Sequence, residues 1–291
     1  MPILLKPLTF IAAIACTLAV PYNARASDTT NPDGSIKTFG FFGQPNGDFS
    51  GFTVLTTGDL MDYNNTVTGP SSVMGNVGVG GHGNYTMSDG TLYGDLYMNN
   101  FGTVKLSGPA RITGTRHGIH ETAPGDDPTD QSMVLQNALD GAHYLSMQAA
   151  MDTNTGSYMV TQGTFNGMTE NGNQNVTLTG TGHIVLTLQD FVMTGGTFTL
   201  SGNAMTSYVI NVTRNFSLNN AKILLSDQLM ASHVLFNIIG KGQDVSMQQG
   251  TSMHGILLAT QRKVNLSGGK VFGRVIADQL ALTSGGQVVS Q

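Results

Sequence analysis

The chain has 291 residues, of which 40% are hydrophobic and only 11% are charged, with 38 glycines, no tryptophan and one cysteine. The formal net charge of −5 argues against a nucleic-acid-binding protein, which needs clustered Lys and Arg side chains. The hydrophobic content is too high for a disordered chain, and short apolar pieces between Gly, Ser, Thr and Asn favour strands and tight turns.

The N-terminus has the pattern of an export signal. An apolar run from Pro7 to Val20 follows a single positive charge, and Ala24 to Ala26 has the small-x-small pattern of a cleavage site. We therefore expect residues 1–26 to be a signal peptide and the exported chain to begin at Ser27. The alternative is a lipoprotein site at Cys16, whose flanking sequence fits poorly. Cleavage would remove the only cysteine, leaving no disulfide and no thiolate ligand.

Residues 27–46 are expected to be a flexible leader, followed by a single domain over residues 47–291. A short unit with a central glycine recurs in this domain, with copies centred on Gly75, Gly94, Gly114, Gly255 and Gly273. The residues two before and two after each glycine are apolar, except that Arg116 follows Gly114. These positions share one parity, so in a strand they would face one side and stack inward, coil above coil. The glycine itself predicts close backbone approach or a bend at a corner.

One segment has helical periodicity. From Thr129 to Met151 a single glycine interrupts the run, and apolar residues recur at steps of three and four: Val134, Ala138, Ala142, Leu145 and Ala149. Asp127 followed by a proline predicts an N-cap and the first helical position. We expect one amphipathic helix at about 129–151, packed along the side of the domain. Nearby Asp126, Asp127 and Asp130 are interpreted as negative charge at its N-terminus.

A second unit reads apolar, small, apolar, small, turn. Its copies begin at Val104, Val176, Phe198, Phe216, Val264 and Leu280. Their middle leucines predict core positions, and the small residues between them predict outward positions, one of which is occupied by Lys105 in the first copy. A flat β-sandwich could also show such alternation, but the recurring spacing of the same unit favours the coils of a β-solenoid. Two runs of coils are expected, separated by the helix near the degenerate Gly114 copy.

The C-terminal motifs resemble those of the choice-of-anchor A family of bacterial surface proteins. The likeness is best in Val234–Ile238, Gly255–Ala259, Val264–Gly269 and Gly273–Ala277, and more widely the chain resembles the β-solenoid of ice-binding proteins. The resemblance implies an all-β fold, a right-handed β-helix with one long α-helix packed along its side, and an adhesive role. The family's C-terminal anchor has no counterpart after Ser290, so release or non-covalent association is expected.

Catalysis has little support in the sequence. The carboxylates are scattered, unlike those of polysaccharide lyases with a β-helix fold, so we expect no enzyme activity, no cofactor and no metal site. His117, His120 and Glu121 form the one cluster of ligand-like residues, but their spacing indicates a solvated loop. His254 and Arg274 flank their repeat glycines and are expected at the surface. Met98 and Met253 occupy apolar repeat positions and are expected in the core.

Binding is better supported than catalysis, because a solenoid offers long flat faces on which outward residues repeat at the strand spacing. Small outward residues that can form hydrogen bonds are candidates for such a face: Thr177, Thr194, Thr197, Thr199, Ser217 and Asn265. The sequence therefore predicts a secreted or surface-associated structural or adhesion protein, with an extracellular polymer, a cell-surface glycan or ice as partner. Ice binding is the second hypothesis, because no ladder of threonine motifs accompanies Thr194 and Thr197. No nucleic acid partner and no membrane span after signal removal are expected.

Overall fold

The computed structural model describes residues 30–31, 33–37, 48–58, 60–63, 73–118, 125–165 and 169–291. The first run of strands comprises β1 (Val54–Thr56), β2 (Leu60–Tyr63), β3 (Val73–Met74), β4 (Val77–Val79), β5 (Tyr85–Asp89), β6 (Thr91–Tyr93), β7 (Leu96–Met98), β8 (Val104–Leu106), β9 (Arg111–Ile112) and β10 (Arg116–His117). Helix α1 (Ser132–Met151) follows. The second run comprises β11 (Ser157–Gln162), β12 (Thr169–Thr181), β13 (His183–Gly202), β14 (Ser207–Leu218), β15 (Lys222–Asp227), the 3-10 turn η2 (Ala231–His233), β16 (Val234–Ile238), β17 (Val245–Met247), β18 (Ser252–Ser267), β19 (Lys270–Thr283) and β20 (Gln287–Val289).

The strands wind around one core as a β-solenoid with three faces. Each coil passes through all three, as β18 shows: residues 252–255 lie on one face, 256–259 on the next and 264–267 on the third. Neighbouring coils pair in parallel, and only β11 pairs antiparallel with its neighbour β12 among the named strands. The expected solenoid is confirmed, and a flat sandwich is excluded.

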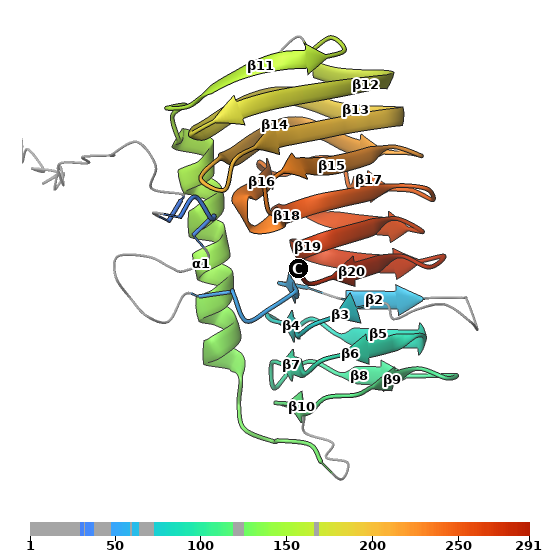
Figure 1. Ribbon diagram of the computed structural model, residues 1–291. Coiled ribbons are helices and arrows are strands. Elements are labelled where there is room, and N and C mark those ends of the chain that lie inside the picture. The colour runs from blue at the N-terminus through green and yellow to red at the C-terminus, as the bar shows by residue number, and fades with distance from the viewer. Residues whose placement is uncertain are drawn as a thin grey trace, which may run out of the picture.

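The coils do not stack in the order of the sequence. β19 pairs with β1, β2 and β20, and β20 in turn pairs with β3. The second run therefore stands on top of the first, and the coil at their junction combines β20 with β1 and β2 from the other part of the chain (Figure 1). The expected two runs are present, and the connection from β10 to β11 is made by α1, which spans the length of the stack.

The corner glycines explain the first repeat. Gly75, Gly94, Gly255 and Gly273 all have positive φ and sit where the chain turns from one face to the next. A Cβ at Gly273 would lie 2.0 Å from the carbonyl oxygen of Gly255, so only glycine fits where these corners stack. The flanking apolar positions are buried in the core, including Met98 and Met253, as expected.

The second repeat is also a core pattern, but it occupies two different faces. The copies at Val176 and Phe198 pair with each other on one face, whereas those at Phe216, Val264 and Leu280 lie on another. The middle leucines of these five copies are fully buried, but in the copy at Val104 the expected core position is wrong, because Leu106 is 36% exposed on β8 at the end of the stack. The alternation of apolar and small residues is the same on both faces, because it reports burial and carries no information about which face a strand joins.

Helix α1 packs against one face of the solenoid, where its apolar side meets Leu55, Val209 and Leu235. Two expectations about it were wrong. It begins at Ser132, because Asp127 instead accepts hydrogen bonds from the backbone and hydroxyl of Thr129, a local turn that replaces an N-cap. Val134 is 49% exposed, and Leu135 and Leu139 lie in the interface in its place.

The expected leader lies only partly among the described residues. There, Ile36 is buried against the helix interface, and its backbone N–H donates to the carbonyl of Ser232. Arg274, expected at the surface, is half-buried and donates from Nη1 to the carbonyls of Phe49, Ser50 and Phe52. Burial lowers the pKa of this guanidinium, and its hydrogen bonds fasten the entry of the chain to the solenoid.

Candidate binding faces

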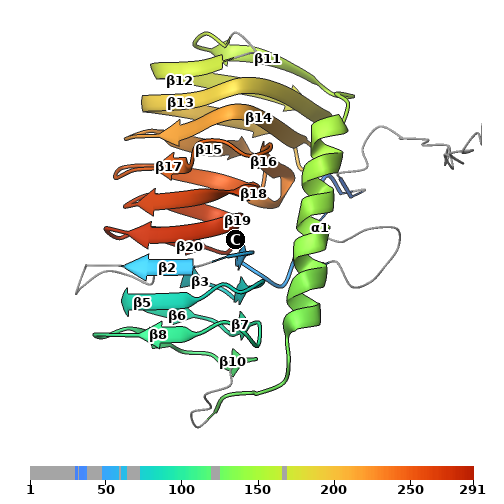
Figure 2. The same ribbon diagram turned by 180° about the vertical axis from the view of Figure 1, so that it is seen from behind.

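One face of the solenoid is covered and two are open. Helix α1 lies along the covered face in both views (Figures 1 and 2), and it packs on β7, β14, β16 and β18. We call the second face the polar face; it contains β2, β5, β8, β17 and the paired parts of β12, β13, β14, β18 and β19. The third, the aromatic face, contains β3, β6, β9, β11, β15, β20 and the paired parts of β12, β13, β18 and β19. Among the described residues no α-helix packs over either open face, and the short turn η2 contacts β18 and β19 beside the aromatic face.

The polar face carries small and charged side chains. A central column runs in register through Ser217, Ser246, Asn265 and Ala281. Its polar groups already bond to each other: Asn265 Nδ2 donates to Asp244 at 2.9 Å. Asp190 accepts from Asn215 Nδ2 at 2.8 Å and pairs with Arg214. Asp190, Arg214 and Asp244 thus have polar partners on this face, which offers a mixed polar surface rather than an apolar one.

The aromatic face carries a continuous apolar and aromatic column. The paired strands place five outward side chains in register over consecutive coils: His254, Phe272, Val289, Met74 and Tyr93. The rings of His254 and Phe272 stack at a centroid distance of 4.7 Å and an interplanar angle of 19°. Met74 and Tyr93 are 45% and 47% exposed. Contiguous exposed apolar side chains of this kind mark interaction surfaces.

The same column becomes hydroxyl-rich toward β11. Thr177 lies opposite Thr199, and Thr199 opposite Leu224, so threonines of two coils adjoin the apolar part. Lys222 and Lys270 lie in the row next to the column, with Ser252 between them. A ligand lying along this face would therefore meet rings and methyl groups in the middle and hydroxyl groups at one end.

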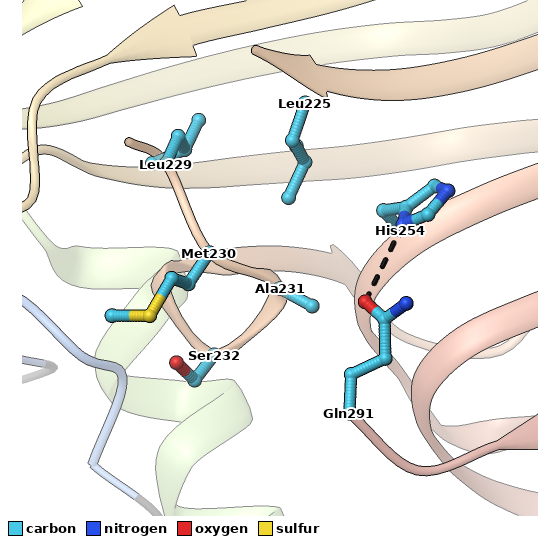
Figure 3. A pocket seen from close by; sticks show the side chains of 7 residues that line it. All are labelled: Leu225, Leu229, Met230, Ala231, Ser232, His254 and Gln291. Carbon is cyan, nitrogen blue, oxygen red and sulfur yellow. Dashed lines mark hydrogen bonds between the residues drawn. The ribbon is translucent and has the colours of Figure 1, made fainter. Parts of the chain in front are cut away.

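A pocket opens beside the column at His254 (Figure 3). It encloses about 460 Å³ and is lined by Leu225, Leu229, Met230, Ala231, Ser232, His254 and Gln291. His254 Nδ1 lies 3.4 Å from Gln291 Oε1, and the loop that carries Met230 and Ser232 forms the opposite wall. An apolar floor with a few polar groups on the rim is the usual composition of a small-molecule site.

The structure separates the six residues expected to form the binding face. Thr177, Thr197 and Thr199 lie together on the aromatic face, near its β11 end. Ser217 and Asn265 lie on the polar face, each next to Ser246. Thr194 is exposed, at the bend of β13 between the two faces. The six therefore do not form one surface.

The aromatic column was missed by sequence reasoning, although a signal for it was present. Met74, Tyr93, His254 and Phe272 each stand immediately before a repeat glycine. All four side chains are large, and their place in the strand has the opposite parity to that of the core positions. A large residue recurring at an outward position is the pattern that would have predicted this column.

The polar clusters among the described residues connect neighbouring segments of the fold. Arg116 forms two hydrogen bonds to Asp126, at 2.7 and 2.6 Å, so this carboxylate does not serve the helix N-terminus as expected. Asp130 does, accepting from the backbone N–H of Ser132. His117 contacts Asp127 and stacks on Tyr97, whereas His120 and Glu121 lie outside the described residues. Among the residues that the structure describes, no three His, Cys, Asp or Glu side chains are grouped to hold a metal ion.

One chain of hydrogen bonds has the composition of a hydrolase triad. His183 Nδ1 lies 2.7 Å from Ser207 Oγ, and its Nε2 lies 2.9 Å from Asp152 Oδ2. Ser207 is only 1% exposed, so its hydroxyl cannot meet an acyl substrate. The three residues instead join the C-terminal end of α1 to β13 and β14.

The β-solenoid with one flanking helix defines the fold class, and sequence comparison names the family. Residues 45–289 match the family described as "Putative Ice-binding-like adhesive domain", and the chain belongs to this family. In the described residues no helix is long and apolar enough to cross a membrane.

Two solved structures share the fold. An ice-binding protein from an Arctic yeast aligns with a TM-score of 0.51 and 16% identity, over 90% of this chain and 96% of its own. The ice-binding protein 1 domain of Shewanella frigidimarina aligns with a TM-score of 0.50 and 17% identity, over 82% and 92%. A search of curated protein sequences finds no match.

Proposed function

We propose that this protein is an exported adhesion protein that holds an extracellular glycan along its aromatic face. The observation that carries the proposal is the column of outward side chains, in register over five coils, that ends beside the pocket at His254. Neighbouring rows of a sheet repeat at about 4.8 Å, so a polymer laid across the strands meets one side chain per coil.

The chemistry of the column suits a sugar polymer. Aromatic rings and Met present apolar surfaces on which the apolar faces of sugar rings can rest, and His254 and Tyr93 add groups that form hydrogen bonds. Lys222 and Lys270 beside the column would favour a glycan that carries acidic groups, because the rest of the column is uncharged. The pocket has room for a substituent of the polymer. Binding of this kind needs no catalytic group and no cofactor.

Export and surface association complete the proposal. Residues 1–26 would act as a signal peptide, Ser27 would begin the exported chain, and the closing motifs resemble those of the choice-of-anchor A family of bacterial surface proteins. Peptide mass analysis of the secreted protein tests this part: an N-terminus at Ser27 is expected, and a lipid-modified Cys16 would contradict it.

Binding to a set of insoluble polysaccharides, followed by a titration with the best ligand, tests the site. Tyr93→Ala and Met74→Ala remove exposed side chains of the column, so each should weaken binding about tenfold with little effect on folding. Ser246→Ala on the polar face is the matched control and should bind as the wild type does. Unchanged binding by the double variant Tyr93→Ala/Met74→Ala would show that the aromatic face is not the site.

Ice binding is the second candidate, because the family description and the names of both solved relatives point to it. The adjoining Thr177, Thr197 and Thr199 are the residues best suited to it, since they form a flat, uncharged patch of hydroxyl and methyl groups. Thermal hysteresis and ice recrystallisation of the wild type decide this candidate. Thr199→Lys should abolish any such activity, and a wild-type solution that freezes like plain buffer removes the candidate.

A further inference from the structure

The end of the solenoid at β11 presents an unpaired strand edge. β11 pairs with β12 along one side, and across the described residues no strand pairs with its other side. All six of its residues are exposed, and Figure 1 shows β11 as the outermost strand of the stack. The free N–H and C=O groups of such an edge can pair with another strand.

The opposite end of the solenoid is protected against such pairing. Its strands β8, β9 and β10 are two or three residues long, and Lys105, Pro109, Arg111 and Arg116 lie in or between them. Short strands, charged side chains and proline are the devices that block edge pairing. β11, with the sequence Ser-Tyr-Met-Val-Thr-Gln, has neither charge nor proline. Its one irregularity is a bulge between Val160 and Gln162, which leaves the residues before it regular.

The sequence of β11 is complementary to itself. Met159 lies opposite the outward Thr179 and Val160 opposite the core residue Leu178, so Ser157, Met159 and Thr161 face outward, and Tyr158 and Val160 face inward. A two-fold axis through Met159, perpendicular to the sheet, would set each Tyr158 opposite a Val160 and each Met159 opposite its own copy. Aromatic–β-branched pairs are favourable across antiparallel strands.

We propose that two copies of this chain associate by antiparallel pairing of their β11 strands, centred on Met159. The pairing covers Tyr158 and Val160, which are 38% and 39% exposed in the single chain. Because the contact is confined to one strand of each copy, it lies at the low end of interface sizes, and we expect a weak, reversible dimer.

The pairing goes beyond the proposed function and does not depend on any ligand, but it would extend the aromatic face. A two-fold axis perpendicular to the sheet keeps the outer surface of both copies on the same side. The two aromatic faces would then form one continuous sheet surface, with an apolar column at each end. A polymer or surface long enough to reach both columns would be held with higher avidity than by one chain.

Disulfide trapping tests the register directly. In a Cys16→Ser background, which removes the one natural cysteine, Met159→Cys places two thiols opposite each other across the two-fold axis. Directly opposite Cα atoms in an antiparallel pair lie about 4.5–5.5 Å apart, within the range of a disulfide. We expect covalent dimers to form at least about tenfold faster than with the control Met147→Cys, a methionine of similar exposure on α1. Equal rates would overturn the proposal.

A charge exchange provides the second test and leaves the fold of the exposed strand intact. Met159→Lys and Met159→Glu each place like charges opposite each other, so each variant alone should dissociate at least about tenfold more readily in sedimentation equilibrium. An equimolar mixture should form the dimer again, because Lys then faces Glu. A mixture that sediments like the separate variants would contradict the pairing.

Hydrogen exchange distinguishes whether a second copy or another segment of the same chain covers this edge. Protection of the β11 amides should rise with protein concentration if a second copy covers them. Protection that is the same at all concentrations means that the edge is covered within one chain, and the proposal fails.

Discussion

The two runs of coils share one axis but are held together differently. In the second run the strands reach 20 residues, and phenylalanines of successive coils pack in the core: Phe191 stacks on Phe216 at 5.4 Å and meets Phe198 edge-on at 5.1 Å. In the first run the strands have two to five residues, and their buried side chains are mostly aliphatic, such as Val77 and Leu96, apart from Tyr85.

In the first run, where the strands are short, polar side chains add hydrogen bonds to the backbone of the next coil. Asn76 Oδ1 accepts from the backbone N–H of Asp95, and Asp95 Oδ1 accepts from that of Thr115, so one ladder crosses three coils. Asn84 makes the same kind of bond to Thr103 one coil on. The difference shows that one repeat can be stabilised by core volume or by side-chain bonds to the backbone.

Removing a ring from the aromatic core should have the largest effect. Phe216 contacts both Phe191 and Phe236, so Phe216→Ala should lower the free energy of unfolding by about 3–5 kcal/mol. Phe216→Leu keeps most of the volume and should cost markedly less. Urea unfolding measures both, and equal losses for the two variants would show that ring packing does not distinguish the second run.

Corner glycines compare the two runs under the same substitution. In Gly273→Ala the new Cβ meets the Gly255 backbone at 2.0 Å, so we expect a loss of roughly 3 kcal/mol. In Gly75→Ala the Cβ meets Thr53 Oγ1 at 2.0 Å and Thr53 Cβ at 2.9 Å; because the hydroxyl can rotate away and no backbone atom is met this closely, a somewhat smaller loss is expected. Gly125→Ala, with positive φ and open space, isolates the backbone cost of roughly 1 kcal/mol. Thermal unfolding should show the largest loss of stability for Gly273→Ala, a smaller one for Gly75→Ala and the smallest for Gly125→Ala. A larger loss for Gly75→Ala than for Gly273→Ala would contradict this distinction.

Cutting one rung of the polar ladder should have a smaller, local effect. Asn84 Oδ1 accepts from the backbone N–H of Thr103 at 3.1 Å and from its hydroxyl at 2.7 Å. Asn84→Ala should cost about 0.5–1 kcal/mol and speed hydrogen exchange in β8 but not in β13. Asn203→Ala, in a turn of the second run, is the control. If the ladder acts only within the first run, this variant should leave hydrogen exchange in β8 unchanged.

The smallest effect concerns the last coil of the first run, which a carboxylate ties to the helix entry. Hydrogen bonds from the hydroxyl and the backbone of Thr129, and then from His117, lower the pKa of Asp127 to about 2. A lowered pKa stabilises the fold above the ordinary value near 3.8, and this contribution is lost as the pH falls toward 2. NMR titration should show that Thr129→Ala raises the pKa toward 3.8, with wild-type behaviour at neutral pH. An unchanged pKa would rule out Thr129 as the main cause.

The repeat around the corner glycines predicted core positions in both runs, and the alternating unit predicted them in the second run, whereas Leu106 in the first run is 36% exposed. Val73, Leu92, Leu200 and Leu266 are fully buried at positions named from the sequence, because parity along a strand fixes which side chains face inward. The corner glycines were predictable for a similar local reason: Gly75 and Gly273 need positive φ. The presence of one helix along the solenoid also followed from its apolar stripe.

The tertiary structure alone decided which strands are neighbours and which face each one joins. Stacking β20 above β3 and below β19 brings Val289 between Phe272 and Met74, and no local pattern contains that adjacency. The same holds for the start of α1, where hydrogen bonds of Asp127 to Thr129 and His117 displaced the expected N-cap. Sequence periodicity reports burial residue by residue, whereas a binding face is made by pairing between segments far apart in the chain.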